Sequence, residues 1–150
     1  MEVFKICREK YSGDLNSSGV ENRWNRKGQF VIYTAASRSL STLELVAHRT
    51  GIMPLSLYKL LVISINDDES LIKQIQIADL PASWNKLDAY PQLQEMGANW
   101  YNSQETLILK VPSAIIPKEF NYVINTKHPL FFDNVKLVRN EDYFWDERLL

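Results

Sequence analysis

The sequence has little of several features that mark whole classes of protein. Its 150 residues include one cysteine, Cys7, which excludes an intramolecular disulfide and an all-cysteine zinc site. It has only 5 glycines and 6 prolines, and 45% of its residues are hydrophobic, which excludes a collagen-like, low-complexity or disordered chain. We therefore expect a globular protein with one domain over residues 1–150.

An excess of charge of either sign is also absent. The chain has 17 Lys and Arg residues against 18 Asp and Glu residues, so no broad basic face is expected and direct binding to nucleic acid is disfavoured. The longest apolar runs, such as residues 60–63, are far shorter than the ~18–20 residues that span a bilayer. The N-terminal residues lack the pattern of a secretory leader. Together with the single cysteine, these features predict a protein of the reducing cytoplasm with no membrane span.

Runs of β-branched and aromatic residues predict more strands than helices. Strands are expected over residues 3–7, 30–34, 58–65, 106–111, 122–124, 135–138 and 143–145. One helix is expected from Ser37 or Ser39 to about Arg49 and another over residues 87–97, whereas residues 70–77 fit an edge strand or a short helix. These elements predict a single compact α+β domain, with short helices interleaved among mixed or antiparallel strands.

The first predicted helix contains the most informative carboxylate. Helical spacing places Leu40, Leu43 and Ala47 on one apolar stripe, with Glu44 beside it. A carboxylate next to an apolar seam must be paired, neutralised or directed into a cleft, because burying it alone is costly. On the residues alone, a glutamate at the edge of the stripe that reaches solvent is the more common outcome.

Residues 15–29 are predicted to form a polar loop with one large anchored side chain, Trp24. The loop contains the sequence Arg23-Trp24-Asn25-Arg26-Lys27-Gly28. Guanidinium groups and the backbone N–H groups of a glycine-containing loop can bind phosphate. Charge clusters on loops are common, however, so a solvated turn is the simpler interpretation of these residues alone.

Other residues with reactive side chains show no recognised catalytic spacing. Tyr33 lies in a predicted strand, where core packing describes most tyrosines, and Ser113 follows the end of a predicted strand. No Gly-x-Ser-x-Gly elbow surrounds Ser113, and His48 and His128 have neither triad nor zinc spacing. A serine hydrolase and a metal site are therefore not supported.

The order of short motifs along the chain is more specific than any one motif. In order, they are Arg23-Trp24-Asn25, Val31-Ile32-Tyr33-Thr34, Ser39-Leu40-x-x-Leu43-Glu44-Leu45-Val46-x-His48, Leu80-Pro81-x-x-Trp84, Gly97-x-x-Trp100, Val111-Pro112-Ser113-Ala114, Pro117-x-Glu119-x-Asn121-Tyr122 and His128-Pro129. This set resembles the RES domain, named for Arg, Glu and Ser, over essentially the whole chain. The chain departs from the family pattern at Glu21-Asn22, where members commonly have Gly-Gly, and at Lys5, where they have an early arginine.

The resemblance implies a fold similar to ADP-ribosyltransferases and a bacterial toxin encoded beside an Xre-type antitoxin. It also implies that the protein depletes NAD+ by cleaving the nicotinamide–ribose bond, with water or inorganic phosphate as acceptor. NAD+ is then the substrate and phosphate a possible co-substrate, with no resident cofactor and no metal. A homodimer within a toxin–antitoxin complex is a further expectation.

The resemblance assigns roles to individual residues. Arg23, Glu44 and Ser113 correspond to the residues that name the family and are predicted to be catalytic. Arg23 would clamp a phosphate, Glu44 would stabilise the developing ribose cation, and Ser113 would orient the ribose or the nicotinamide amide. The predicted substrate-binding residues, besides Arg23, are Tyr33 packed on the nicotinamide ring, Trp24 and Asn25 at the pocket rim, and Asn121 in support.

Two alternatives stay open at this point. The same pocket could transfer ADP-ribose to a protein target, because only the acceptor would change. A non-enzymatic partner-binding protein would instead use exposed aromatic residues, namely Trp84, Trp100 and the segment Tyr143-Phe144-Trp145. Under the enzyme interpretation, His48 and Trp100 are predicted to be packing residues.

Overall fold

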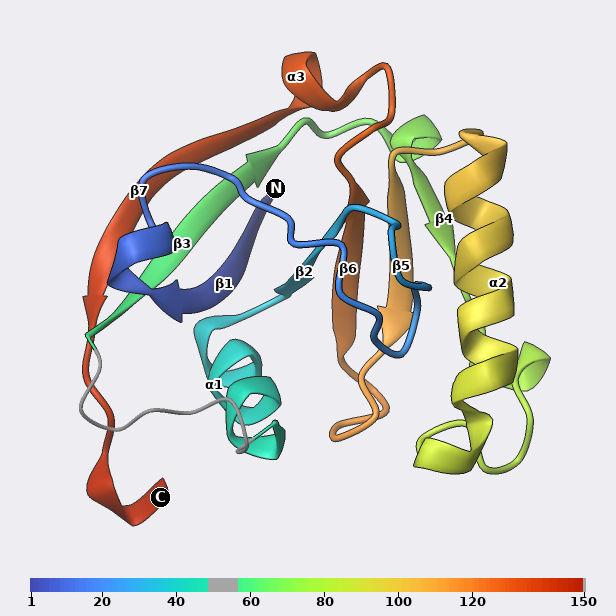
Figure 1. Cartoon of the computed structure of the whole chain (residues 1–150), viewed down its shortest axis with the longest axis horizontal. Coiled ribbons are helices and arrows are strands. Elements are labelled where there is room, and N and C mark those ends of the chain that lie inside the picture. Colours follow the sequence, from blue (N-terminus) through green and yellow to red (C-terminus); the bar gives the residue numbers. More distant parts are fainter. Residues whose placement is uncertain (49–56, 150) are drawn as a thin grey trace.

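The structure, a computed structural model, describes residues 1–48 and 57–149 and contains one mixed sheet (Figure 1). Its strands lie in the order β4-β5-β6-β2-β1-β3-β7. They are β1 (Glu2–Arg8), β2 (Val31–Ala35), β3 (Tyr58–Ile65), β4 (Ile72–Gln74), β5 (Ile108–Pro112), β6 (Phe120–Asn125) and β7 (Val135–Tyr143). β4 pairs with β5 in parallel, and the other neighbours pair antiparallel. This arrangement confirms the predicted α+β class.

Three α-helices accompany the sheet in the described residues: α1 (Arg38–Ala47), α2 (Tyr90–Ser103) and α3 (Phe131–Asn134). The Ser37 hydroxyl caps α1 by accepting the Leu40 N–H at 3.0 Å, as predicted for one of two serines. The predicted end of this helix, Arg49, lies outside the described residues. No helix in the described ranges is long and apolar enough to cross a membrane.

The second helix differs from its prediction at both ends. Residues 87–89 form a 3₁₀ turn, and α2 then continues past Gly97 to Ser103, where Gln104 in the left-handed conformation ends it. Gly97 was expected to stop the helix because glycine is common after helix ends. It lies inside the helix instead, for a packing reason given below.

The C-terminal strand also differs from its prediction. The two expected short strands, 135–138 and 143–145, are replaced by the single strand β7 (Val135–Tyr143), and Phe144 and Trp145 lie beyond its end. The polar residues 139–142 fit within a strand because β7 is at the edge of the sheet, where outward side chains meet solvent. In residues 70–77 the structure has a 3₁₀ turn followed by the short edge strand β4.

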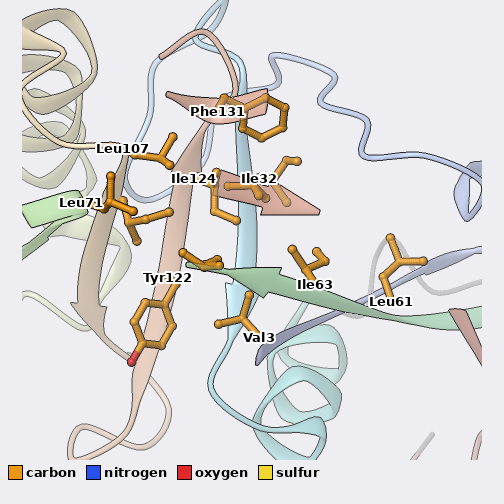
Figure 2. Packing of buried hydrophobic residues seen from close by; sticks show 12 residues of the cluster. Val3, Ile32, Leu61, Ile63, Leu71, Leu107, Tyr122, Ile124 and Phe131 are labelled. Carbon is orange, nitrogen blue, oxygen red and sulfur yellow. The ribbon is translucent and has the colours of Figure 1, made fainter. Parts of the chain in front are cut away.

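Buried side chains gather on both faces of the sheet. One cluster contains Ile32, Ile63, Ile124 and Phe131 (Figure 2). The other face packs against α2, whose Leu93 and Trp100 contact strand residues that include Val31 and Val123, with Tyr33 partly buried beside them. Val31 and Tyr33 therefore share a face opposite Ile32, as strand alternation predicts.

The sheet opens between β1 and β2. These strands pair at the single position Phe4↔Ala35, at the end of β2, and β1 otherwise follows β3 (Figure 1). The register continues from Ala35 to Asn121 on β6 and from Asn121 to Val111 on β5. The side chains of Phe4, Ala35, Asn121 and Val111 thus form one row across four strands, on the face that also carries Tyr33. The candidate site lies over this row.

Candidate functional site

A cavity of about 450 Å³ lies over this row of side chains. Its walls come from β1, β2, β5, β6, the start of α2, helix α1 and the loop that precedes β2. Six lining residues carry its chemistry: Arg23, Trp24, Tyr33, Glu44, Tyr90 and Asn121. Glu44 is the one carboxylate among the described residues that line it, and we call this space the Glu44 cavity.

Two hydrogen bonds hold the Glu44 carboxylate. Its Oε1 accepts the Ser113 hydroxyl at 2.9 Å and the Asn121 amide Nδ2 at 2.7 Å. Both bonds involve the same oxygen, and Oε2 accepts no hydrogen bond from any described residue. The carboxylate is therefore fixed by one oxygen, and the other is available to a ligand in the cavity.

Glu44 reaches this position because α1 is rotated relative to the predicted stripe. Leu40 and Ser41 are buried, and Leu45 packs against the side chains of β1 and β3, whereas Leu43 is 37% exposed and Ala47 is exposed. The predicted apolar stripe is thus confirmed for Leu40 and wrong for Leu43 and Ala47. On the observed buried face, helical spacing places Glu44 between Leu40 and Leu45 rather than beside the seam.

Ser113 lies behind Glu44 and does not line the cavity. It is fully buried at the end of β5, and its Oγ accepts the backbone N–H groups of Ile115 and Ile116 at 3.1 Å each while donating to Glu44. The turn after β5 therefore orients the hydroxyl, and the hydroxyl orients the carboxylate. All of its bonding capacity is used within the protein, so Ser113 positions Glu44.

Arg23 is held on two sides at the cavity wall. Its Nη1 donates to the Trp84 carbonyl at 3.0 Å, and its guanidinium lies over the Tyr90 ring with Cζ 4.8 Å from the centroid. A guanidinium has five N–H donors, so most remain available for an anion in the cavity. Tyr90 was missed by the sequence analysis, because nothing near it in the sequence marks it as Arg23's partner.

A hydrogen-bond network fixes the loop that carries Arg23. The Tyr33 hydroxyl donates to Asn25 Oδ1 at 2.6 Å and accepts the Trp24 N–H at 3.0 Å. Asn25 is fully buried, does not line the cavity, and donates to the Val20 carbonyl at 2.9 Å. Asn25 therefore stabilises the loop from its buried side. Burial raises the pKa of the Tyr33 phenol, so the hydroxyl stays protonated and can donate.

Helix α2 supports the same loop through Gly97. A Cβ built on Gly97 would lie 1.7 Å from the Trp24 carbonyl oxygen, so only glycine permits this contact between helix and loop. The Gln94 side chain donates to the Asn22 carbonyl at 2.9 Å and ties the loop to the same helix. Trp24 is buried under the loop and also lines the cavity.

Three predictions about large side chains can now be judged. Trp100 is buried at 3% exposure, which confirms it as a packing residue. His48 is not a packing residue, because it is exposed at the end of α1, lines the cavity and contacts the Glu44 carbonyl through Nδ1 at 2.7 Å. Trp84 and Trp100 are both buried, which contradicts their predicted exposure in the partner-binding alternative, whereas Phe144 of its third aromatic segment is exposed.

No described group of three or more His, Cys, Asp or Glu residues could hold a metal ion.

Comparisons with known proteins identify the family of this chain. The family model described as the RES domain matches residues 3–146. The chain is 32% identical over 153 residues to a Yersinia enterocolitica protein named "Toxin Res", covering 99% of both chains. It is also 32% identical over 151 residues to a Sphingobium protein named "Prs ADP-ribosylating toxin", covering 96% of this chain and 91% of that protein.

A third relative, a Photorhabdus laumondii protein also named "Toxin Res", is 30% identical over 154 residues and covers all of this chain and 97% of its own. The mixed sheet with few helices is consistent with the ADP-ribosyltransferase-like fold that the resemblance implies. The match over nearly the whole chain and the full-length relatives show that this protein belongs to the RES domain family.

Proposed function

We propose that this protein is a toxin that depletes NAD+ by cleaving the nicotinamide–ribose bond. The observation that carries the proposal is the Glu44 carboxylate, fixed through Oε1 by Ser113 and Asn121, with Oε2 unbonded by the described residues in a cavity that also holds Arg23. Relatives of nearly the same length are named as toxins, and one is named as ADP-ribosylating. These names support an enzyme that uses an ADP-ribose donor.

Glu44 is suited to the charge that develops during this reaction. Nicotinamide leaves NAD+ as a neutral molecule, so its departure needs little acid assistance, but it leaves an oxocarbenium-like ribose. In the proposed mechanism, Glu44 Oε2 faces the ribose, accepts a hydrogen bond from a hydroxyl and stabilises the cation. A preorganised charge costs no reorganisation during the reaction, and Ser113 and Asn121 provide that preorganisation.

Arg23 and Tyr33 complete the proposed substrate contacts. Arg23 donates its remaining N–H groups to the pyrophosphate, and the Tyr90 ring limits the guanidinium's freedom. The Tyr33 hydroxyl is used by Trp24 and Asn25, so the ring rather than the hydroxyl packs on nicotinamide. Trp24 contributes to the pocket wall, Asn25 supports the loop from behind, and Ser113 acts through Glu44.

The acceptor is proposed to be water or inorganic phosphate, which would make the enzyme a glycohydrolase or a phosphorylase. Transfer of ADP-ribose to a protein is the second candidate, favoured by the name of the Sphingobium relative. We also propose that the protein acts in the cytoplasm, and that an Xre-type antitoxin binds a homodimer of this chain and restricts access to the Glu44 cavity.

The test is a time course of NAD+ with purified, antitoxin-free protein, with and without phosphate, in which chromatography separates nicotinamide, ADP-ribose and ADP-ribose-1″-phosphate. Release of nicotinamide without phosphate indicates a glycohydrolase, and release that requires phosphate indicates a phosphorylase. If NAD+ is consumed only when a protein acceptor is added, and mass spectrometry finds that protein modified, the transferase replaces both. No release under any condition contradicts the proposal.

Two variants connect the reaction to the site. Glu44→Gln keeps the shape of the side chain and removes its charge, and Arg23→Ala removes the guanidinium, so each is expected to abolish nicotinamide release in a folded protein. Glu95→Gln, at an exposed position on α2, is the matched control and is expected to retain the wild-type rate. A wild-type rate in folded Glu44→Gln or Arg23→Ala would refute the assignment.

A further inference from the structure

A second cavity, of about 500 Å³, shares the lining residue Lys5 with the Glu44 cavity and otherwise has different walls. Strand alternation directs Lys5 and Cys7 of β1 away from the face of Phe4, and Lys5 lies opposite Leu61 of β3 in the strand register. Tyr11, residues 14–18 and Ile32 of β2 complete the walls. The cavity exists because β1 and β2 diverge beyond their single pair, and the loop before β2 covers the gap. We call it the Lys5 cavity.

The Lys5 side chain is only partly accessible, and no described residue of opposite charge pairs with it. Within residues 1–48 and 57–149, its ammonium makes no hydrogen bond and no ion pair. The acid on the cavity wall, Asp14, makes no ion pair and accepts the Leu15 N–H at 2.7 Å. Burial lowers the pKa of Lys5 and raises that of the neighbouring Cys7 thiol.

A partly buried cation without a partner is unfavourable, and an anion that enters the cavity would relieve this cost. The walls indicate which anion. Leu15, Ile32 and Leu61 provide apolar surface, and Lys5 is the one cation among the described lining residues. The remaining wall is mostly polar, with Tyr11, Asp14, Asn16, Ser17 and Ser18. Polyphosphates favour several cations, arginine forks or a helix N-terminus, none of which belongs to the described lining. A single cation beside this mixed surface instead fits a small monoanion with a short apolar part.

We propose that the Lys5 cavity binds a small organic carboxylate, whose anionic group pairs with the Lys5 ammonium and whose apolar part packs on Leu15, Ile32 and Leu61. Phe4, Lys5 and Ile6 of β1 also line the Glu44 cavity, so the two cavities adjoin at this strand, with Lys5 as the residue they share. This inference does not depend on the reaction proposed for Glu44.

The experiment uses the full chain labelled with ¹³C at lysine Cε and titrated with sodium butyrate, with sodium chloride at equal ionic strength as the reference. Saturable movement of the Lys5 resonance, with a rise in the Lys5 pKa in bound protein, is expected because the carboxylate stabilises the ammonium. Lys5→Met removes the charge at similar length and should weaken butyrate binding at least tenfold. Lys73→Met, at an exposed position on edge strand β4, should bind as wild type.

Each contrary result has a defined meaning. A Lys5 resonance that moves no more with butyrate than with chloride overturns the proposal, and because this is measured on wild-type protein, it holds even if Lys5→Met does not fold. Inorganic phosphate that binds more tightly than butyrate overturns the carboxylate class. Competition between butyrate and NAD+ in the Glu44→Gln protein would assign the Lys5 ammonium to the Glu44 cavity, and would overturn the proposal of a separate site.

Discussion

Replacing Gly97 by alanine tests the contact that positions the Arg23 loop. In a helix interior this change normally stabilises a protein by about 1 kcal/mol, because alanine has the higher helix propensity. Here the new methyl carbon would lie 1.7 Å from the Trp24 carbonyl oxygen and 2.6 Å from the carbonyl carbon. Because these are backbone atoms, the overlap is relieved only if the loop or the helix moves.

Gly97→Ala is therefore expected to lower the stability of this protein rather than raise it. Overpacking of this kind costs typically about 1–3 kcal/mol, and an overlap with backbone belongs at the upper end of that range. After the gain in helix propensity is subtracted, the free energy of unfolding should fall by about 2 kcal/mol. Movement of Trp24 also displaces the adjacent Arg23, so the rate of nicotinamide release should fall in protein that remains folded.

Urea unfolding followed by circular dichroism measures the change. Asn99→Ala is the control, because residue 99 lies on the exposed side of the same helix and gains propensity without a clash. We expect Asn99→Ala to raise the urea midpoint slightly and Gly97→Ala to lower it, with similar slopes for the two variants. A Gly97→Ala protein as stable as Asn99→Ala would refute the close approach of α2 to the loop.

Two other substitutions test how the site's charged groups are held. Ser113→Ala removes a hydrogen-bond donor to Glu44 and leaves the Ile115 and Ile116 N–H groups without their acceptor. The free energy of unfolding should therefore fall by about 1–3 kcal/mol, and kcat by roughly tenfold. An unchanged kcat in folded protein would contradict the positioning role of Ser113. Tyr90→Leu removes the ring under Arg23 and should raise KM for NAD+ about fivefold, which corresponds to a loss of about 1 kcal/mol of binding free energy. Tyr90→Phe keeps the ring and should leave KM near the wild-type value. Equal KM values in the two variants would argue against a role of the ring in holding Arg23.

Features set by neighbouring residues could be predicted from the sequence. Alternation placed Tyr33 opposite Ile32, and a serine before an amphipathic run marked the start of α1, because strand and helix periods and caps depend on a few adjacent residues. The run of residues 58–65 is strand β3 over those same residues. The α+β class follows from the number and order of such local signals.

Contacts between distant segments could not be predicted in this way. Ser113 and Glu44 are 69 positions apart, and their hydrogen bond depends on the end of β5 meeting one particular face of α1. The rotation of α1 was mispredicted because Leu43 has the side chain of a typical core residue, although it is 37% exposed in the structure. Gly97 was read as a helix stop because its reason for being glycine is the Trp24 carbonyl, far away in the sequence.

The number of carboxylates in the Glu44 cavity bears on the kind of reaction it can support. Hydrolysis of an ordinary glycoside uses two carboxyl groups, one of which protonates the leaving group. Among the described lining residues Glu44 is alone, and its Oε1 already accepts two hydrogen bonds. Nicotinamide carries a positive charge in NAD+ and leaves as a neutral molecule, so its departure needs no such acid. The ribose cation that remains still needs an anion to stabilise it. One fixed carboxylate thus favours NAD+ over a neutral glycoside as the substrate.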